Sequence, residues 1–490
     1  MSQAVKLSLG KPLTNTYAGL SPAFYTLHRP VAVKSPELIL FNSALASQLG
    51  WDTTDCSKSD IAEMLSGNVV PEGGISLAQA YAGHQFGHFN MLGDGRAILL
   101  GEIEAPDGQR YDIQLKGAGK TRYSRGGDGR ATLKSMLREY LISEAMHGLG
   151  IATTRSLAVV ATGEPVIRET IQPGAVLTRV AKSHIRVGTV EFARQFLEET
   201  QQRQLMDYLI QRHYPELQDD PNPALALLNA IMEKQVGLIT EWMRVGFIHG
   251  VMNTDNMSLA GETIDYGPCA FMNTYHPGTK FSSIDTQGRY AYGNQPRIAH
   301  WNLSCLAGAM LPLMDKNEQK AINMAQAALN RFPELYQKAW INMMRNKLGW
   351  TGEDAGDELL INQLLDWMQG NQADYTNTFL GIQDGDFSIE ENLADHDFQE
   401  WYQLWKRRAT QGGQSFAALR DKMAPYNPVY IPRNHQVELA LDIAAEHNDF
   451  GKFTELLSLL QQPYQHIKGK ETYQNPPEDG DQGYRTFCGT

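Results

Sequence analysis

Residues 249–267, HGVMNTDNMSLAGETIDYG, bring the ligands of a cation site into one short piece of chain. The pattern predicts a helix that ends near Arg244 and, after Asn256, a short hairpin that turns at Gly261 and carries Asp265 back toward Asn256. A carboxylate and an amide oxygen held together suit Mg²⁺, which takes oxygen ligands and bridges the phosphates of a substrate. The alternative is an ordinary turn that is rich in Asn and Asp.

The same stretch has the register of a protein-kinase catalytic loop with one substitution. In that loop the metal-binding Asn follows a His by seven residues, as Asn256 follows His249. The kinase base is an Asp two residues after the His, and this chain has Val251 there. Asp255 is the carboxylate of the loop that could replace it. Three explanations are open: an inactive kinase, an accidental likeness, or a catalyst of another reaction.

The bulk composition is that of a soluble globular protein. The chain has 490 residues, 42% of them hydrophobic, and a net charge of −12. This length suits two or three domains or one large two-lobed enzyme. The chain has no apolar run of the roughly eighteen residues that a membrane helix needs and no apolar signal core, so we expect a cytoplasmic protein without membrane contact. The negative charge argues against nonspecific binding to nucleic acid.

The cysteines give no sign of a zinc site or a disulfide framework, because they are scattered and form no Cys-x-x-Cys pair. They are Cys56, Cys269, Cys305 and Cys488. A reducing compartment fits this pattern best.

A run of basic residues stands out from the acidic chain. Between residues 116 and 138 there are seven basic residues and the single acid Asp128. The basic residues are Lys116, Lys120, Arg122, Arg125, Arg130, Lys134 and Arg138. We therefore predict a polyphosphate site here.

Lys116 and Glu139 are a candidate pair within this run. Residues 93–117 predict a β-hairpin around Pro-Asp-Gly, with Lys116 on the face opposite its apolar residues. A helix predicted over 132–147 carries Glu139. A strand Lys held by a helix Glu positions nucleotide phosphates in protein kinases, but taken alone the two residues are equally compatible with solvated charges.

Two glycine motifs were tested as phosphate loops. GAGKT at 117–121 is not a P-loop, because the required earlier Gly is Gln114, inside a predicted strand. In GDGR, Gly93 and Gly95 allow close backbone approach to phosphate and Arg96 adds a charged donor, although an ordinary tight turn has the same pattern. Arg179 and Arg186 lie where a nucleotide cleft is expected, and alone they too suit solvated arginines.

The order of elements predicts an α+β fold. Strands are expected first, including 154–162 and 175–181, and the chain then becomes mainly helical. The predicted helices cover 191–213, 224–244, 317–346, 357–370 and 435–461. Together with the kinase-like loop, this order predicts a protein-kinase-like two-lobed fold with a β-rich N-lobe, an α-rich C-lobe and extensions at both ends.

We predict five parts of the chain. They are an N-terminal extension wrapped on the core (1–75), an N-lobe with the nucleotide-phosphate site (76–185), a C-lobe with the catalytic loop and metal site (186–345), a C-terminal helical part of that lobe (346–464) and a flexible tail with Cys488 (465–490). The tail is expected to be loose because it is rich in Pro, Asp, Gln and Gly.

Long stretches of the chain resemble the selenoprotein O family, kinase-like proteins that transfer the AMP of a nucleotide rather than its γ-phosphate. The likeness covers nearly the whole sequence. The matching stretches are LSPAFYTLHRP, FNSALASQLGW, AQAYAGHQFGHF, LGDGRAILLGE, LKGAGKTRYSRGGDGRATLKSMLREYLISEAMHGLGI, HGVMNTDNMSLAGETIDYGP and QGRYAYGNQP.

The resemblance implies a role for each candidate residue. Asp255 is the expected base, Asn256 and Asp265 the expected metal ligands, and Glu139 the expected partner of Lys116. The expected nucleotide contacts are Gly93, Gly95, Arg96, Lys116, Asp128, Gly129, Arg179 and Arg186. Family members carry Cys or selenocysteine third from the end, and here that residue is Cys488, which implies a redox role with Cys269 as a conjectural partner.

The resemblance also implies the reaction. We expect transfer of AMP from ATP to Ser, Thr or Tyr hydroxyls of target proteins, with release of pyrophosphate and with Mg²⁺ or Mn²⁺, by an enzyme that is a monomer. The alternatives are UMP transfer from UTP, an ordinary kinase that moves the γ-phosphate, and a nucleotide-binding pseudoenzyme that serves as a scaffold.

Overall fold

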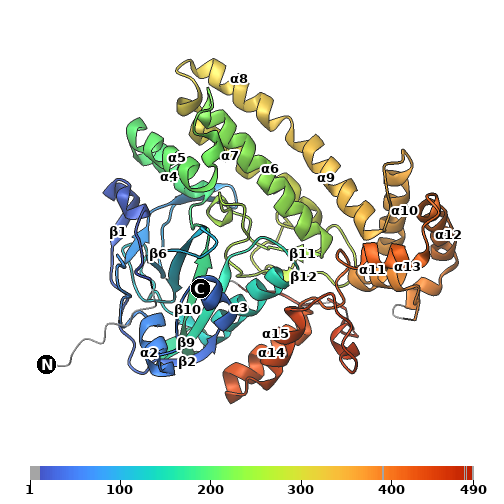
Figure 1. Ribbon diagram of the computed structural model, residues 1–490, viewed down its shortest axis with the longest axis horizontal. Helices are drawn as coiled ribbons and strands as arrows, with labels where there is room; N and C mark the ends of the chain where they lie inside the picture. The colour runs from blue at the N-terminus through green and yellow to red at the C-terminus, as the bar shows by residue number, and fades with distance from the viewer. Residues whose placement is uncertain (1–10, 389–390, 479, 482, 488–490) are drawn as a thin grey trace.

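The computed structural model describes residues 11–388, 391–478, 480–481 and 483–487. Figure 1 shows the strands gathered at one end of the molecule, with the long helices extending away from them. This is the predicted mixed α+β composition with an antiparallel sheet. None of the described helices is both long enough and apolar enough to span a membrane.

One antiparallel sheet organises the first 181 residues. Its strand order is β1-β3-β6-β7-β10-β9-β2, and β8 pairs with β10. The strands are β1 (Tyr25–Leu27), β2 (Glu37–Phe41), β3 (Leu77–Gln79), β6 (Ala97–Glu104), β7 (Arg110–Lys116), β8 (Ala131–Thr132), β9 (Arg155–Ile167) and β10 (Ile171–Ala181). Two small hairpins or ladders lie outside it: β4 (Ala82–Gln85) with β5 (His88–Met91), and β11 (Phe247–Ile248) with β12 (Ala270–Phe271).

The N-terminal segment completes this sheet. Strands β1 and β2 are its two opposite edges, so residues 25–41 reach from one side of the sheet to the other. Helices α1 (Ser43–Gln48) and α2 (Lys58–Leu65) then pack on one sheet face, where Leu45, Leu65, Ile113 and Val160 share one hydrophobic cluster. The predicted extension is thus built into the sheet, because its short apolar strands find partners only there.

Helix α3 (Leu133–Gly148) lies on the other face of the sheet, in contact with β9 and β10. Thr132 caps it, as predicted, and its side chain accepts a hydrogen bond from the Ser135 amide. The predicted hairpin is confirmed as β6 and β7, and the predicted strand pair as β9 and β10.

The rest of the chain is helical. The helices are α4 (Val187–Phe196), α5 (Glu199–His213), α6 (Pro223–Arg244), α7 (Gln295–Met314), α8 (Glu318–Leu329), α9 (Phe332–Lys347), α10 (Asp357–Gly370), α11 (Tyr375–Asp384), α12 (His396–Thr410), α13 (Phe416–Met423), α14 (Asn434–His447) and α15 (Gly451–Leu460). The predictions at 224–244 and 357–370 are confirmed as α6 and α10.

Three predicted long helices are wrong as single elements, because each is two helices. The backbone is extended at Leu197, between α4 and α5. Pro333 opens α9, where its missing N–H costs nothing, and so separates α9 from α8. Asn448 takes a left-handed conformation that ends α14 before α15. Sequence periodicity alone did not detect α7, α11, α12 and α13.

The predicted hairpin between Asn256 and Asp265 is also wrong. Its two arms do not pair with each other: Ser258 bridges to Arg186, and Thr263 bridges to Thr153. The turn at Gly261 is present, with a φ of 78°. The arms separate because each pairs with the backbone of another segment. The loop therefore lies between the start of α4 and the start of β9.

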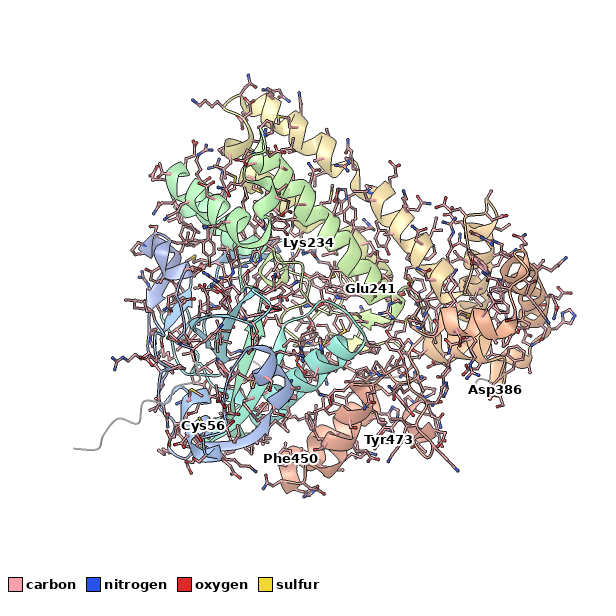
Figure 2. All side chains as sticks on the ribbon, in the orientation of Figure 1. Cys56, Lys234, Glu241, Asp386, Phe450 and Tyr473 are labelled. Carbon is pink, nitrogen blue, oxygen red and sulfur yellow. The ribbon has the colours of Figure 1, made fainter. Side chains whose placement is uncertain are left out.

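The described part of the C-terminal tail is packed rather than loose. Asp481 accepts hydrogen bonds from the backbone and side chain of Asn273, and Thr486 bridges to Ser282. Figure 2 shows Phe450 and Tyr473 on the C-terminal segments beside α14 and α15, and Cys56 at the far side of the sheet. Cys56, Cys269 and Cys305 are free thiols, and Cys488 lies outside the described residues.

Candidate active site

A cleft of about 440 Å³ lies between the sheet and residues 251–268. Eleven of the predicted site residues line it: Gly93, Gly95, Arg96, Lys116, Asp128, Gly129, Arg179, Arg186, Asp255, Asn256 and Asp265. Glu139 stands behind Lys116, to which it is bonded. The structure therefore brings together residues that are up to 172 positions apart in the sequence.

The cleft is strongly cationic. Its described lining has seven Lys or Arg residues (Arg96, Lys116, Arg125, Arg130, Arg168, Arg179, Arg186) and four aspartates (Asp94, Asp128, Asp255, Asp265). In a chain with a net charge of −12, this local excess of positive charge favours a polyanionic ligand.

Lys116, Glu139 and Arg179 form a buried ion cluster at the back of the cleft. The Lys116 Nζ lies 2.6 Å from Glu139 Oε2, and Arg179 Nε lies 2.5 Å from Glu139 Oε1. All three side chains are buried. Burial and the nearby Arg179 charge lower the pKa of Lys116, although Glu139 and Asp265 oppose them. The predicted Lys116–Glu139 pair is thus confirmed as a contact.

Asp265 is surrounded by cations. Its Oδ1 accepts from Lys116 Nζ at 3.4 Å and from Arg179, and its Oδ2 lies 3.4 Å from Arg186. Burial by itself raises the pKa of Asp265, but the charges of Arg179, Lys116 and Arg186 hold it well below its usual range. The residue has a φ of 64°, a left-handed conformation that Asp tolerates better than most residues and that aims its carboxylate into this cluster.

The segment 249–265 is fixed by a buried His. His249 lies at 0% exposure, its ring stacks on Trp242, and its Nε2 bonds the Ile264 carbonyl at 2.9 Å. This contact ties the start of the loop to the residue before Asp265. The Asn256 side-chain amide nitrogen donates to the Val251 carbonyl at 3.0 Å, so its amide oxygen is the end that can bind a cation.

Asp255 is the most isolated carboxylate of the cleft. It is 8% exposed, and its Oδ1 is buried without a hydrogen-bond partner among the described residues. Burial raises the pKa of Asp255 to about 6, against the opposing charge of Arg186. A carboxylate with a pKa near neutrality suits a group that accepts a proton.

The loop with Gly93 and Gly95 packs on Tyr123. A Cβ at Gly93, where φ is 116°, would lie 2.5 Å from the Tyr123 ring, so only glycine fits this approach. The Thr121 hydroxyl donates to the Asp94 carbonyl at 2.6 Å, and the Ser124 hydroxyl donates to the Gly95 carbonyl. Residues 121–124, which start at the last residue of GAGKT, thus hold the GDGR turn in place through these two hydrogen bonds.

The basic run divides between two places. Lys116, Arg125 and Arg130 line the cleft. Lys134 and Arg138 pair instead with Glu438 on α14, because the helical period of α3 turns them toward that helix. Lys120 and Arg122 do not line the cleft either, so the prediction that all seven basic residues form one polyphosphate site is wrong for four of them.

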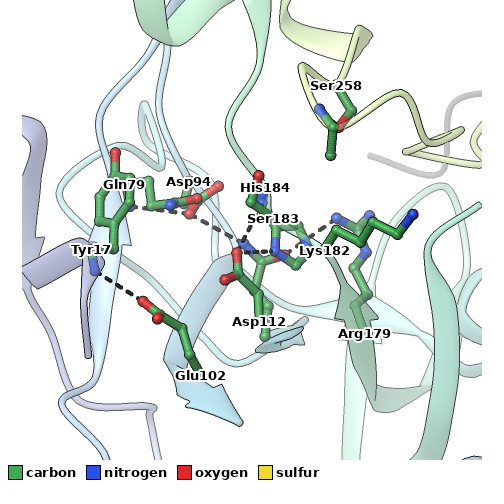
Figure 3. Close-up of polar contacts among 12 residues, drawn as sticks. Tyr17, Gln79, Asp94, Glu102, Asp112, Arg179, Lys182, Ser183, His184 and Ser258 are labelled. Atoms are coloured by element: carbon green, nitrogen blue, oxygen red, sulfur yellow. Dashed lines mark hydrogen bonds and ion pairs between the residues drawn. The ribbon is translucent and has the colours of Figure 1, made fainter. Parts of the chain in front are cut away.

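A buried network under the cleft places Arg186. Asp112 Oδ2 accepts from the His184 amide at 2.8 Å and pairs with the His184 ring at 3.0 Å, as Figure 3 shows, and Asp112 Oδ1 accepts from Arg212. These bonds fix the backbone two residues before Arg186. The Arg186 guanidinium then donates to the Asp255 carbonyl oxygen at 3.1 Å.

Several lining residues had no predicted role. Arg168 holds both oxygens of Asp128, at 2.8 and 3.1 Å, although 40 residues separate them. Gln85, Phe86 and Tyr81 come from the β4–β5 region. The glycines of AGHQFG signalled close packing there: a Cβ at Gly83 would lie 2.8 Å from Asp255 Oδ1. The sequence did not show which residue packs against these glycines, and the structure identifies Asp255 as that residue for Gly83.

A sequence model of the family described as protein adenylyltransferase SelO matches residues 9–461. The chain belongs to this SelO family. The protein nucleotidyltransferase YdiU of Nitrosococcus oceani is 53% identical to it over 482 residues, which is 98% of each chain. The proteins of that name from Alkaliphilus metalliredigens and Brevibacillus brevis are each 52% identical, over 99% and 97% of both chains. Membership of SelO confirms the predicted family and the predicted enzyme class, nucleotidyl transfer.

Proposed function

We propose that this enzyme transfers AMP from ATP to Ser, Thr or Tyr hydroxyls of target proteins. One observation carries the proposal: Asp255, whose Oδ1 is buried without a hydrogen-bond partner among the described residues, lines the same cationic cleft as two oxygen donors for a metal, Asn256 and Asp265. The names of the family and of its relatives support AMP as the group and protein as the acceptor.

The proposed fold is the kinase-like one, with the cleft between a β-rich and an α-rich lobe. The Lys116–Glu139 contact and the seven-residue spacing from His249 to Asn256 support it. Val251 stands at the position of the kinase base, and its side chain cannot take a proton. We assign that role to Asp255, which lies four residues further along the same loop.

In the proposed reaction the acceptor hydroxyl oxygen attacks the α-phosphorus of ATP. A bond forms between that oxygen and the α-phosphorus, the bond from the α-phosphorus to the oxygen that joins it to the β-phosphate breaks, pyrophosphate leaves with that oxygen, and the hydroxyl proton passes to Asp255. Lys116, Arg179 and Arg186 neutralise the triphosphate, and Asp128 and Gly129 contact the nucleotide. Such transfers depend mostly on positioning and on charge neutralisation.

The donor set fits a divalent cation. A carboxylate from Asp265 and an amide oxygen from Asn256 are the hard oxygen ligands that Mg²⁺ and Mn²⁺ take. When bound to Asn256 and Asp265, the metal would offset the negative charge of the phosphates. Asp265 is suited to this because its neighbouring cations keep it ionised.

Labelled nucleotides test the proposal directly. The purified enzyme is incubated with Mg²⁺ or Mn²⁺, a protein extract and ATP labelled at the α or the γ phosphate, and modified proteins are identified by mass. We expect α-label on protein and a mass gain of AMP. Retention of γ-label alone would identify a kinase, a gain of UMP with UTP would change the donor, and no transfer with intact nucleotide binding would indicate a scaffold.

The redox role of Cys488 remains a prediction. Cys488 is outside the described residues, and Cys269 is fully buried, with a pKa that burial raises to about 11. Thr486, two residues before Cys488, donates its hydroxyl to the Pro268 carbonyl at 2.6 Å.

A further inference from the structure

A second cavity opens beside the catalytic cleft. It has a volume of about 680 Å³ and shares two lining residues with the cleft, Phe86 and Ile284. Its other walls are His88, the loop 285–289 and the first turns of α7, including Arg297 and Trp301. The two cavities therefore lie next to each other, and Asp255 is in the lining of the catalytic cleft.

The wall of this cavity is bonded to the catalytic loop. Asn253 Oδ1 accepts from the Phe86 amide at 3.1 Å and from the Tyr290 hydroxyl at 2.6 Å. Asn253 is two residues before Asp255. The cavity and the proposed base are therefore held in one rigid arrangement, as the alignment of an acceptor hydroxyl requires.

The charges of the cavity favour an anion. Arg289 and Arg297 make no ion pair with any described residue. Asp285, the carboxylate of the described lining, is buried and already accepts from the backbone amides of Arg289 and Tyr290, each at 2.8 Å. The lining thus presents two guanidinium groups with no carboxylate free to neutralise them.

The stability of the loop and the helix that carry these two arginines does not explain why arginine stands at either position. Arg297 is exposed in the first turn of α7, where the helix dipole disfavours a positive charge. Arg289 lies 4.7 Å over the Trp301 ring, a contact that orients the guanidinium, and its Nε is buried without a partner. A carboxylate ligand in the cavity would pair with the charge of both guanidinium groups.

We propose that this cavity holds the acceptor segment of the protein substrate, with an acidic side chain of that segment bound by Arg289 and Arg297. Ile284, which is 50% exposed between the two cavities, and Trp301 provide apolar contact for the neighbouring residues of the segment. The inference rests on the proposed transfer to protein hydroxyls. It adds a substrate class: hydroxyls that have an Asp or Glu nearby in the sequence.

The test compares the sites that two enzymes modify. Wild-type enzyme and Arg297→Glu each label a protein extract with α-labelled ATP, and the modified hydroxyls are mapped by mass spectrometry. We expect Asp and Glu to be enriched near the sites of the wild type, and Arg297→Glu to lose that enrichment and to accept Lys and Arg there. Equal site preferences for both enzymes would overturn the proposal.

A peptide copied from the best wild-type site gives the kinetic readout. For this peptide we expect Arg297→Glu to raise KM at least tenfold with kcat changed less than twofold, and Arg297→Lys to restore most of the affinity. Arg289→Gln, which removes the charge, should act in the same direction. Arg407→Glu, the same charge change at an exposed position on α12, is the matched control and should leave KM unchanged.

The outcomes separate the two proposals. If no α-label enters any protein, the proposed function fails, and this inference with it. If label enters but Arg297→Glu weakens ATP binding and not peptide binding, the cavity belongs to the nucleotide and the inference alone is overturned.

Discussion

At the residue scale, two carboxylates of one cleft have opposite pKa shifts. Burial raises the pKa of Asp255 to about 6, whereas Arg179, Lys116 and Arg186 hold that of Asp265 well below its usual range although burial opposes them. Carboxylates that differ in this way are suited to different tasks. One can accept a proton near neutral pH, and the other stays ionised for a cation.

Replacing Asp255 tests the first task. Asp255→Asn keeps the size of the side chain but removes the proton acceptor, so we expect kcat for AMP transfer to fall by roughly 10² to 10⁴. The Kd for ATP, measured by calorimetry, should change little, because the phosphates are bound by other residues. Asp366→Asn, at an exposed position on α10, is the control; normal kcat in Asp255→Asn would contradict the assignment.

Glu262 gives a pH-dependent prediction for stability. Burial raises its pKa from 4.5 to about 7, opposed by Lys182. Because the folded state then holds more protons than the unfolded state, Glu262 makes the protein less stable as pH rises from about 4.5 to about 7, by up to about 3 kcal/mol. Its Oε2 accepts from the Lys182 amide at 2.9 Å, an acceptor role that Gln preserves.

We therefore expect Glu262→Gln to match the wild type in Tm near pH 4.5 and to exceed it by a growing margin up to pH 7. Thermal unfolding across this range measures the difference. Glu446→Gln, at an exposed site on α14, is the control and should show no pH-dependent difference in Tm from the wild type. If Glu262→Gln also shows no such difference, the predicted contribution of Glu262 to stability is wrong.

At the element scale, the β4–β5 hairpin packs against Asp255. The His84 amide donates to the Thr254 hydroxyl at 2.7 Å, and the His84 ring lies 2.5 Å from Glu191 on α4. The hairpin is thus fastened to the catalytic loop on one side and to the helical part on the other. Gly83 lies where the hairpin comes closest to the proposed base.

Gly83→Ala tests this element. The backbone of Gly83 suits any residue, but the added Cβ would lie 2.8 Å from Asp255 Oδ1. We expect kcat to fall at least tenfold, because small displacements of a reacting group are costly, with a small change in Tm. Gly19→Ala adds a methyl group with nothing within 4 Å and should be silent. An unchanged kcat would mean that the hairpin shifts to make room for the methyl group and that Asp255 keeps its place, which would contradict the prediction.

At the scale of the whole molecule, the C-terminal part holds the segment that follows Asp265. Arg433, at 1% exposure, bonds Asp374 at 2.5 and 3.1 Å, Asn273 at 2.7 Å and the Gln474 carbonyl at 2.6 Å. Four distant segments meet at this one guanidinium. The helices after residue 346 therefore help to hold the segment that follows Asp265 in place.

Arg433→Met is expected to cost about 3 to 5 kcal/mol, because it leaves Asp374 buried without its counter-charge. Tm should fall by several degrees, as measured by differential scanning calorimetry. The double variant with Asp374→Asn, which keeps the helix-capping oxygen, should lose less than the sum of the two single changes. Strict additivity would contradict the pairing, and Arg407→Met on the exposed face of α12 is the control.

The sequence by itself determined the local pieces and most of the residues that line the cleft. Turn residues and alternation predicted β6 and β7, and the spacing of Lys116 and Glu139 predicted their contact, because a strand and the helix after it pack together within a short length of chain. The kinase-like register predicted Asp255 and Asn256, and the predicted hairpin added Asp265; all three line one cleft, although the arms of that hairpin do not pair.

Only the tertiary structure decided which distant segments meet. It placed β1 and β2 at opposite sheet edges, paired Arg168 with Asp128, opened the arms around Gly261 and set a second cavity beside the cleft that Asp255 lines. The physical reason is that periodicity and turn chemistry act within a few residues. Edge pairing, ion pairs and cavities depend on where the packed core brings remote side chains and unpaired backbone groups.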